Sequence, residues 1–175
     1  YRMGEAFIKL KNPENALAMF QKVEKVFPNS PYAGDAKMKT GLVLYHSEEY
    51  IQSIEKFKSI VSDYPATAIA REAISNARSV YVDLGDVKAY ADWVETLSFI
   101  NISLSSLDST SYESAELHYL KGNFKKAFDG FESYVNSFPE GVFKLSAHYY
   151  LGNSALEIGE TDQALAAFEV VATYH

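Results

Sequence analysis

Residues 41–65, GLVLYHSEEYIQSIEKFKSIVSDYP, set out the order of residue types that decides the fold. The small residue Gly41 is followed twelve residues later by Ser53, sixteen later by Phe57 and twenty-four later by Pro65. The same order recurs along the chain with steps of 36 to 38 residues. The first small residue of each repeat is Gly4, Gly41, Ala77, Ala115 or Gly152, the second is Ala16, Ser53, Ala89, Ala127 or Ala164, and the aromatic residue is Phe20, Phe57, Trp93, Phe131 or Phe168. A repeat of this length indicates a stacked array.

Each repeat is predicted to contain two helices. Residues Ala16, Phe20, Val23 and Phe27 follow the i, i+4, i+7, i+11 spacing of one helix face. About 37 residues hold two helices of roughly 14 residues with two turns between them. Helix starts are predicted at Asn12-Pro13-Glu14 and again at Ser30-Pro31, and turns within repeats at Gly85-Asp86, Gly122-Asn123 and Gly159-Glu160.

The small residues recur at fixed positions for a steric reason. Two antiparallel helices approach closely only where a small side chain on one helix admits a bulky side chain from the other. The glycine or alanine of the first helix meets this need, and the aromatic residue sixteen positions later fills the gap. One helix pair cannot bury its apolar face alone, whereas a stack of neighbours buries it continuously.

This order of small, small, aromatic and proline positions resembles the tetratricopeptide repeat family over essentially the whole chain. The resemblance implies an all-α, right-handed α-α superhelix of about nine or ten helices. The approximate repeats are 1–29, 30–66, 67–104, 105–140 and 141–175. The family period is 34 residues, so the present repeats are longer. This longer form is similar to bacterial cell-envelope proteins of the family, such as outer-membrane assembly lipoproteins and periplasmic coordinators, and to long multi-repeat proteins of Bacteroidetes-type bacteria.

Composition excludes several other classes. The 175 residues contain no cysteine, so disulfide frameworks and thiolate metal sites are excluded. The formal charge of −7, from 23 Asp and Glu against 16 Lys and Arg, argues against nucleic acid or an anionic membrane as a partner. No apolar run reaches the length of a bilayer span, so we expect no direct membrane insertion.

The sequence contains no catalytic or metal-binding motif that we recognise. The four histidines are His46, His118, His148 and His175, and no two of them share the i, i+3 or i, i+4 spacing of a helix-borne metal pair. We expect them at the surface or at the edge of a groove. Phosphate-binding glycine loops and the nucleophile elbow are also missing. We therefore expect no enzyme activity, no cofactor and no metal.

Tyrosine is the most informative residue type for function, with 13 of 175 residues. The family resemblance implies that the first helix of each repeat lines a concave groove. The residues that would face it are Met38, Leu42, Tyr45, Ile74, Arg78, Tyr81, Tyr112, Glu116, Tyr119, Tyr149, Asn153 and Leu156. Tyr45, Tyr81 and Tyr119 share one column and would form a tyrosine ladder. Tyrosine combines a large rigid area with a polar group and suits peptide binding; the alternative is that these rings only pack between helices. Arg71 and Arg78 form a partial basic patch, short of the Lys/Arg clamp that some co-chaperones of the family use for carboxylates.

The third repeat is the least regular. Asn101 occupies its proline position, and the serine-rich stretch from Asn101 to Thr110 follows. Helix caps are recognisable only from Ser109 to Ser111. We expect a longer connection between helices here, with a hinge or a sheltered binding loop as the alternative, because irregular segments of repeat arrays often carry function.

Two functions remain in competition. The first is a non-enzymatic scaffold that binds a segment of a protein or peptide in the tyrosine-lined groove. The second is an assembly platform in a bacterial cell-envelope machine of the outer-membrane assembly or Tol-associated type. The resemblance favours a periplasmic or outer-membrane-associated location over the cytoplasm. Because 175 residues are about 4.7 repeats of 37, we expect a slice of a longer array, which could also act as a spacer between other domains. The oligomeric state is left open.

Overall fold

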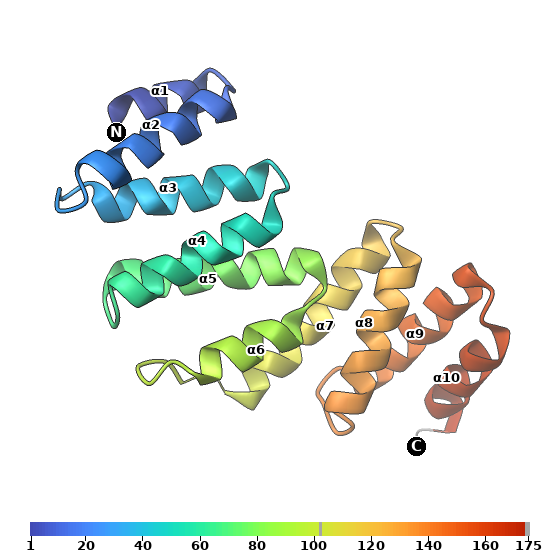
Figure 1. Ribbon diagram of the computed structural model, residues 1–175. Helices are drawn as coiled ribbons and strands as arrows, with labels where there is room; N and C mark the ends of the chain where they lie inside the picture. The colour runs from blue at the N-terminus through green and yellow to red at the C-terminus, as the bar shows by residue number, and fades with distance from the viewer. Residues whose placement is uncertain (102, 174–175) are drawn as a thin grey trace. The chain divides into compact units, whose positions relative to one another are not determined.

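The computed structural model describes residues 1–101 and 103–173, which form ten helices and no strand (Figure 1). Ile102, within the triplet Asn101-Ile102-Ser103, and His175 lie outside the described residues. The chain divides into two compact units, unit 1 from Tyr1 to Tyr81 and unit 2 from Val82 to His175. Each unit is a stack of antiparallel helices, and each is described by itself.

Unit 1 is built from consecutive helices that pack on their neighbours in chain order. The helices are α1 (Arg2–Lys9), α2 (Pro13–Val26), α3 (Ala33–His46), α4 (Tyr50–Asp63) and α5 (Ala68–Leu84), whose last turn belongs to unit 2. α1 packs on α2, α2 on α3, and α3 on α4. The Asn76 amide donates to the Met38 sulfur at 3.3 Å, which joins α5 to α3.

Unit 2 repeats this arrangement with one short helix. Its helices are α6 (Val87–Glu95), α7 (Leu104–Leu120), α8 (Phe124–Ser137), α9 (Lys144–Ile158) and α10 (Thr161–Thr173). Neighbours in the chain pack together from α6 to α10, and α7 also contacts α9. α6 has 9 residues, whereas α2, α4 and α8 have 14 each. The third repeat is therefore irregular because its second helix is short.

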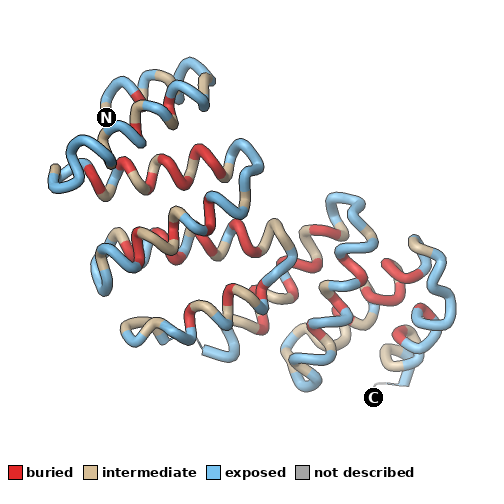
Figure 2. Tube along the Cα trace, viewed as in Figure 1, coloured by how far each residue is buried: buried red, intermediate tan, exposed pale blue. Residues whose placement is uncertain are grey.

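The predicted pairing of small and aromatic residues is confirmed in the first, second, fourth and fifth repeats, whereas Ala89 and Trp93 of the third are only half-buried. Buried residues, drawn red in Figure 2, recur along the helices of each unit. Phe20, Phe57 and Phe131 are among the fully buried residues. A Cβ atom placed on Gly41 would lie 2.6 Å from a ring carbon of Phe57, and one placed on Gly152 would lie 2.6 Å from Phe168. The aromatic ring therefore occupies the space that a side chain on the first helix would need.

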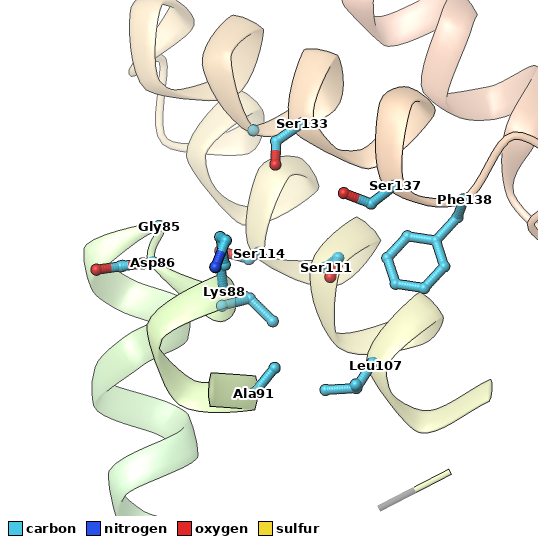
Figure 3. A pocket seen from close by; sticks show the side chains of 12 residues that line it. Gly85, Asp86, Lys88, Ala91, Leu107, Ser111, Ser114, Ser133, Ser137 and Phe138 are labelled. Carbon is cyan, nitrogen blue, oxygen red and sulfur yellow. The ribbon is translucent and has the colours of Figure 1, made fainter. Parts of the chain in front are cut away.

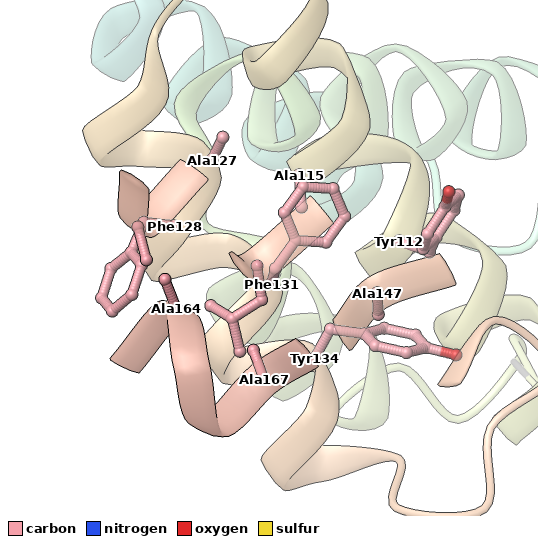
Figure 4. Packing of buried hydrophobic residues seen from close by; sticks show 11 residues of the cluster. Tyr112, Ala115, Ala127, Phe128, Phe131, Tyr134, Ala147, Ala164 and Ala167 are labelled. Atoms are coloured by element: carbon pink, nitrogen blue, oxygen red, sulfur yellow. The ribbon is translucent and has the colours of Figure 1, made fainter. Parts of the chain in front are cut away.

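In unit 2 the same columns form a continuous core. Phe131 and Tyr134 of α8 lie among the alanines of the flanking helices (Figure 4). Ala115, Ala127 and Ala147 are almost completely buried there. Small residues on three helices thus let two aromatic rings fill the space between them.

The turn between the two helices of a repeat has one backbone conformation throughout the array. Gly85, Gly122 and Gly159 adopt positive φ angles of 80°, 73° and 84°, which confirms the predicted turns. Lys11 and Glu48 adopt φ of 54° and 62° at positions that precede Gly85 by multiples of 37 residues. Left-handed backbone favours glycine because other residues have a Cβ that clashes with the carbonyl oxygen. Two of the five turns therefore carry strain that the sequence did not reveal.

Two predicted helix boundaries need correction. Asn12 caps α2 as predicted, since its side chain accepts a hydrogen bond from the amide of Asn15 at 3.1 Å. Ser30-Pro31, in contrast, does not begin the next helix. The amide of Ala33 donates to the carbonyl of Ser30 in a turn, and α3 starts only at Ala33.

The second correction concerns the expected connection from Asn101 to Thr110. α7 begins at Leu104, so residues 104–110 are its first two turns. Ser103 has an extended backbone, and its hydroxyl accepts a hydrogen bond from the amide of Ser106 at 3.1 Å. The cap therefore lies six residues before the predicted position, and the serine-rich stretch is helical.

Candidate functional site

In unit 1 the predicted groove residues differ in exposure. Met38, Ile74 and Tyr81 are buried, whereas Leu42 and Tyr45 are half-buried. Little of the three buried side chains is available to a partner. Arg78 is half-buried as well, and Arg71 is exposed.

The two tyrosines of unit 1 pack against their surroundings. The ring of Tyr45 lies 5.6 Å from that of His46 and 6.0 Å from that of Tyr50. The ammonium group of Lys58 lies 5.7 Å from the centre of the Tyr81 ring, a cation–π distance. The Tyr45 ring thus contacts its own helix and α4, and the Tyr81 ring contacts α4, while Tyr45 remains half-buried.

In unit 2, Tyr112 and Glu116 form a hydrogen-bonded pair on α7. The Tyr112 hydroxyl donates to Glu116 Oε1 at 3.0 Å, and its ring stacks on Phe143, just before α9, at 4.5 Å. Burial raises the pKa of Tyr112, and the hydrogen bond to Glu116 raises it further. The stacking places this pair on the side of α7 that faces α9.

Three predicted residues on α9 share one helix face at i, i+4 and i+7. Tyr149 and Leu156 are 50% and 52% exposed, and Asn153 between them is half-buried. The Asn153 side chain donates to the carbonyl of Tyr149 at 3.1 Å. The Tyr149 ring is backed by Tyr150 at 5.4 Å. α9 therefore presents a large, supported apolar surface beside a polar group.

Tyr119 joins the helices at this surface. Its ring lies 4.9 Å from Tyr150 of α9 and 5.6 Å from Phe124 of α8. The contacting helices α7 and α9 carry five predicted residues of unit 2, which we name the α7–α9 face: Glu116, Tyr119, Tyr149, Asn153 and Leu156. The third ladder tyrosine, Tyr119, belongs to unit 2, whereas Tyr45 and Tyr81 belong to unit 1.

A pocket of about 250 Å³ lies among α6, α7 and α8, and sequence reasoning missed it (Figure 3). Small residues line it on all three helices, among them Ala91, Ser111 and Gly130. A neighbouring pocket of about 300 Å³ shares Ala91 and extends to Asn101. The only signal in the sequence was the irregular third repeat, which contains α6, and Val87 and Ala91 of this helix line the pocket.

Of the three described histidines, only His118 is buried. Its side chain is 3% exposed, and neither ring nitrogen has a hydrogen-bond partner among the described residues. Burial lowers the pKa of His118, and Lys126 and Lys121 lower it further, while Asp83 acts in the opposite direction. The expectation that every histidine lies at the surface or a groove edge was therefore wrong for His118, which packs under the turn at Gly85.

The described residues contain no cluster of three or more histidine, aspartate or glutamate side chains that could hold a metal ion. Within residues 1–101 and 103–173, no helix has the length and apolar character of a membrane span.

Comparison with known proteins places these features in a family. The family profile described as Tetratricopeptide repeat matches residues 1–30 and 146–175, the two ends of the array. No curated protein sequence matches the chain.

Three solved structures with a similar course of the chain are distant in sequence. MamA from Desulfovibrio magneticus RS-1 is 14% identical with a TM-score of 0.49, over 98% of this chain and 90% of that one. A tetratricopeptide repeat protein from Parabacteroides merdae is 13% identical with a TM-score of 0.48, over 97% and 76% of the two chains. YrrB, described as a tetratricopeptide repeat protein with an unusual peptide-binding site, is 16% identical with a TM-score of 0.45, over 95% and 79%.

Proteins of this family are in general non-enzymatic scaffolds for protein or peptide partners. The matches at both ends and the glycine–phenylalanine packing of the helix pairs lead to the same assignment. Residues 1–30 and 146–175 thus match the tetratricopeptide repeat family, and the described residues between them form helix pairs of the same kind.

Proposed function

We propose that the chain is a scaffold that holds a segment of a protein partner on its first-helix faces, and in unit 2 on the α7–α9 face. The observation that carries the proposal is the exposure of Tyr149 and Leu156 on a helix whose other apolar residues are buried or half-buried. Aromatic and aliphatic side chains of this kind supply most of the binding free energy where a partner covers them. The hydrogen-bonding groups of Asn153 and Glu116 would fix the register of the bound segment.

The buried members of the predicted groove have a supporting role in this proposal. Tyr112 holds Glu116 by its hydroxyl, and Tyr150 supports the ring of Tyr149 from beneath. Such packing keeps the exposed side chains in one orientation, so less side-chain entropy is lost on binding. In unit 1, Leu42, Tyr45 and Arg78 are the half-buried residues that we propose for partner contact, above the buried Met38, Ile74 and Tyr81.

The experiment uses short random peptides displayed on phage and selected on the whole chain. The double variant Tyr149→Ala/Leu156→Ala is expected to weaken the selected peptides by about tenfold or more, because it removes two central apolar contacts. The matched control is Val142→Ala/Leu165→Ala, which shortens two apolar side chains that are also exposed but lie outside the α7–α9 face. Equal dissociation constants for parent and Tyr149→Ala/Leu156→Ala would refute binding at this face.

The role of platform in a cell-envelope machine is a second proposal that rests on repeat length. Steps of 36 to 38 residues exceed the family period of 34. Sequencing the 5′ end of the parent gene tests it: a signal peptide with a lipobox cysteine would favour it, and a plain cytosolic start would count against it.

A further inference from the structure

The charges of the chain are divided unevenly between the two units. Unit 1 contains eleven Lys and Arg against nine Asp and Glu, a net charge of +2. Unit 2 contains five Lys against fourteen Asp and Glu, a net charge of −9. The overall value of −7 therefore arises entirely in unit 2, where the α7–α9 face lies.

The few lysines of unit 2 are largely matched to local acids. Four of the five form ion pairs within the described part of the unit: Lys88–Asp92 at 2.6 Å, Lys121–Asp83 at 3.0 Å, Lys125–Asp129 at 2.7 Å and Lys144–Glu140 at 3.2 Å. The paired residues lie at the end of α5, on α6 and α8, directly after α7, and at or just before the start of α9, and none of them is Tyr149 or Leu156. The unit's own cations therefore do little to offset negative charge beside the exposed apolar residues.

Two carboxylates lie on the helices that carry the α7–α9 face. Glu116 uses Oε1 to accept the Tyr112 hydrogen bond, so the same contact fixes the position of its second oxygen. Glu157 is exposed on α9, directly after Leu156 and one turn beyond Asn153. Acidic groups thus lie on both helices that make the face, and an exposed tyrosine ring lies on α9 with them.

We infer that the segment bound on the α7–α9 face is basic, with Lys or Arg side chains directed to Glu116 and Glu157. The inference rests on the proposed function and names the chemistry of its partner. A cation meets three favourable features there: two carboxylates, the face of the Tyr149 ring, and the field of a unit with a charge of −9. The aliphatic stem of the same side chain covers apolar area such as that of Leu156. An acidic segment would meet like charge at each position, so complementarity also sets specificity.

The test applies the phage selection to the whole chain and scores the composition of the selected peptides. We expect Lys and Arg to be enriched among peptides whose binding requires Tyr149 and Leu156. For such peptides, Glu116→Gln/Glu157→Gln should weaken binding by about fivefold at low salt and reduce the salt dependence, because exposed ion pairs are weak and screened. The matched control Glu132→Gln/Glu169→Gln removes two charges from exposed positions on α8 and α10 and should change the dissociation constant by less than about twofold.

Glu157→Gln alone, at an exposed position, separates charge from packing, since Glu116→Gln also alters the contact with Tyr112. Peptides that need Tyr149 and Leu156 but show no basic bias would overturn the inference and leave the scaffold proposal standing. A different result would overturn both the inference and the scaffold proposal for this face. In that result, both pairs of glutamine substitutions weaken the binding of basic peptides equally, and Tyr149→Ala/Leu156→Ala does not change it. Salt-sensitive self-association in sedimentation that is lost in Glu116→Gln/Glu157→Gln would assign the face to a second copy of the chain and overturn the basic-peptide inference.

Discussion

Replacement of Gly41 by alanine tests the packing on which the fold depends. The added Cβ would lie 2.6 Å from one ring carbon of Phe57 and 3.0 Å from two others. Carbon atoms in contact are normally about 3.5–4.0 Å apart, so the ring or the helix must move by about 1 Å. Phe57 is fully buried and has no free space to rotate into. The cost of such overpacking is about 1–3 kcal/mol.

Helix propensity acts in the opposite direction. Alanine inside a helix is favoured over glycine by about 1 kcal/mol, which offsets part of the clash. The net expectation is a loss of about 1–2 kcal/mol, or a fall in Tm of roughly 2–8 °C for a chain of this size. Thermal and urea unfolding followed by circular dichroism at the helix band measures both quantities.

Gly34 is the matched control, because it lies in the same helix. A Cβ there would meet only the terminal methyl of Ile69 at 3.0 Å and the Tyr64 ring at 3.6 Å. A flexible methyl moves at little cost, so Gly34→Ala should be neutral or stabilising by up to about 1 kcal/mol. The double variant Gly41→Ala/Phe57→Leu should lose less unfolding free energy than the sum of the losses in the two single variants, because leucine is smaller than phenylalanine and leaves room for the added Cβ. Gly41→Ala at least as stable as the parent, or no coupling with Phe57→Leu, would refute the steric argument.

Three further predictions concern unfolding free energies. Tyr134→Phe should cost about 2 kcal/mol, because it removes a donor 2.5 Å from the buried Asp108. Burial and this bond raise the pKa of Tyr134 to about 12, so the parent should lose more stability than Tyr134→Phe as the pH rises from 10 to 12. Glu48→Gly should gain about 0.5–1 kcal/mol, because φ at this position is 62°. The pKa of His118 is lower in the folded chain, so protonation of this residue opposes folding and stability should fall as the pH drops below about 6.5. His118→Leu should make this fall in stability smaller. The part that remains is due to His148, whose pKa is also lowered by burial.

Each of these has a control in the same chain. Tyr64→Phe alters a half-buried tyrosine and should change stability by less than about 0.5 kcal/mol. Glu49→Gly, one residue beyond Glu48 at a position with negative φ, should not stabilise. His46→Leu at an exposed site controls for replacing a histidine by leucine as such. A Glu48→Gly variant no more stable than Glu49→Gly, or an unaltered pH profile in His118→Leu, would contradict the corresponding argument.

The fold was predictable because its repeated residues act on each other directly. Gly41 and Phe57 are in direct contact, so their spacing in the sequence predicts a contact in the structure. The helix start at residues 104–110 was not predictable in this way. Asp108 there accepts hydrogen bonds from the Tyr134 hydroxyl and the Val142 amide, which are 26 and 34 residues away. Serine and aspartate are weak helix formers by themselves, and the contacts that hold them in α7 are tertiary.

The candidate site was predictable only as a set of positions. Periodicity identifies the side of a helix on which Tyr81 and Tyr149 lie, but the depth of burial depends on neighbouring elements. Tyr81 is covered and has Lys58 above its ring, whereas Tyr149 is half exposed. The pocket beside α6 depends on where that helix ends, and the end of a helix is the feature that sequence patterns define least well.

In the connection from α8 to α9, which Asp108 contacts, the exposure of a side chain differs from the exposure of its backbone amide. The Val142 side chain is 82% exposed, yet its amide donates at 2.9 Å to a carboxylate that is almost completely buried. The next amide, Phe143, donates to the Tyr134 hydroxyl at 3.0 Å. Deuterium should therefore enter these two loop amides only when α7 and α8 separate, with protection factors close to those of the α8 core. A connection that looks open to solvent would then report the global opening of unit 2.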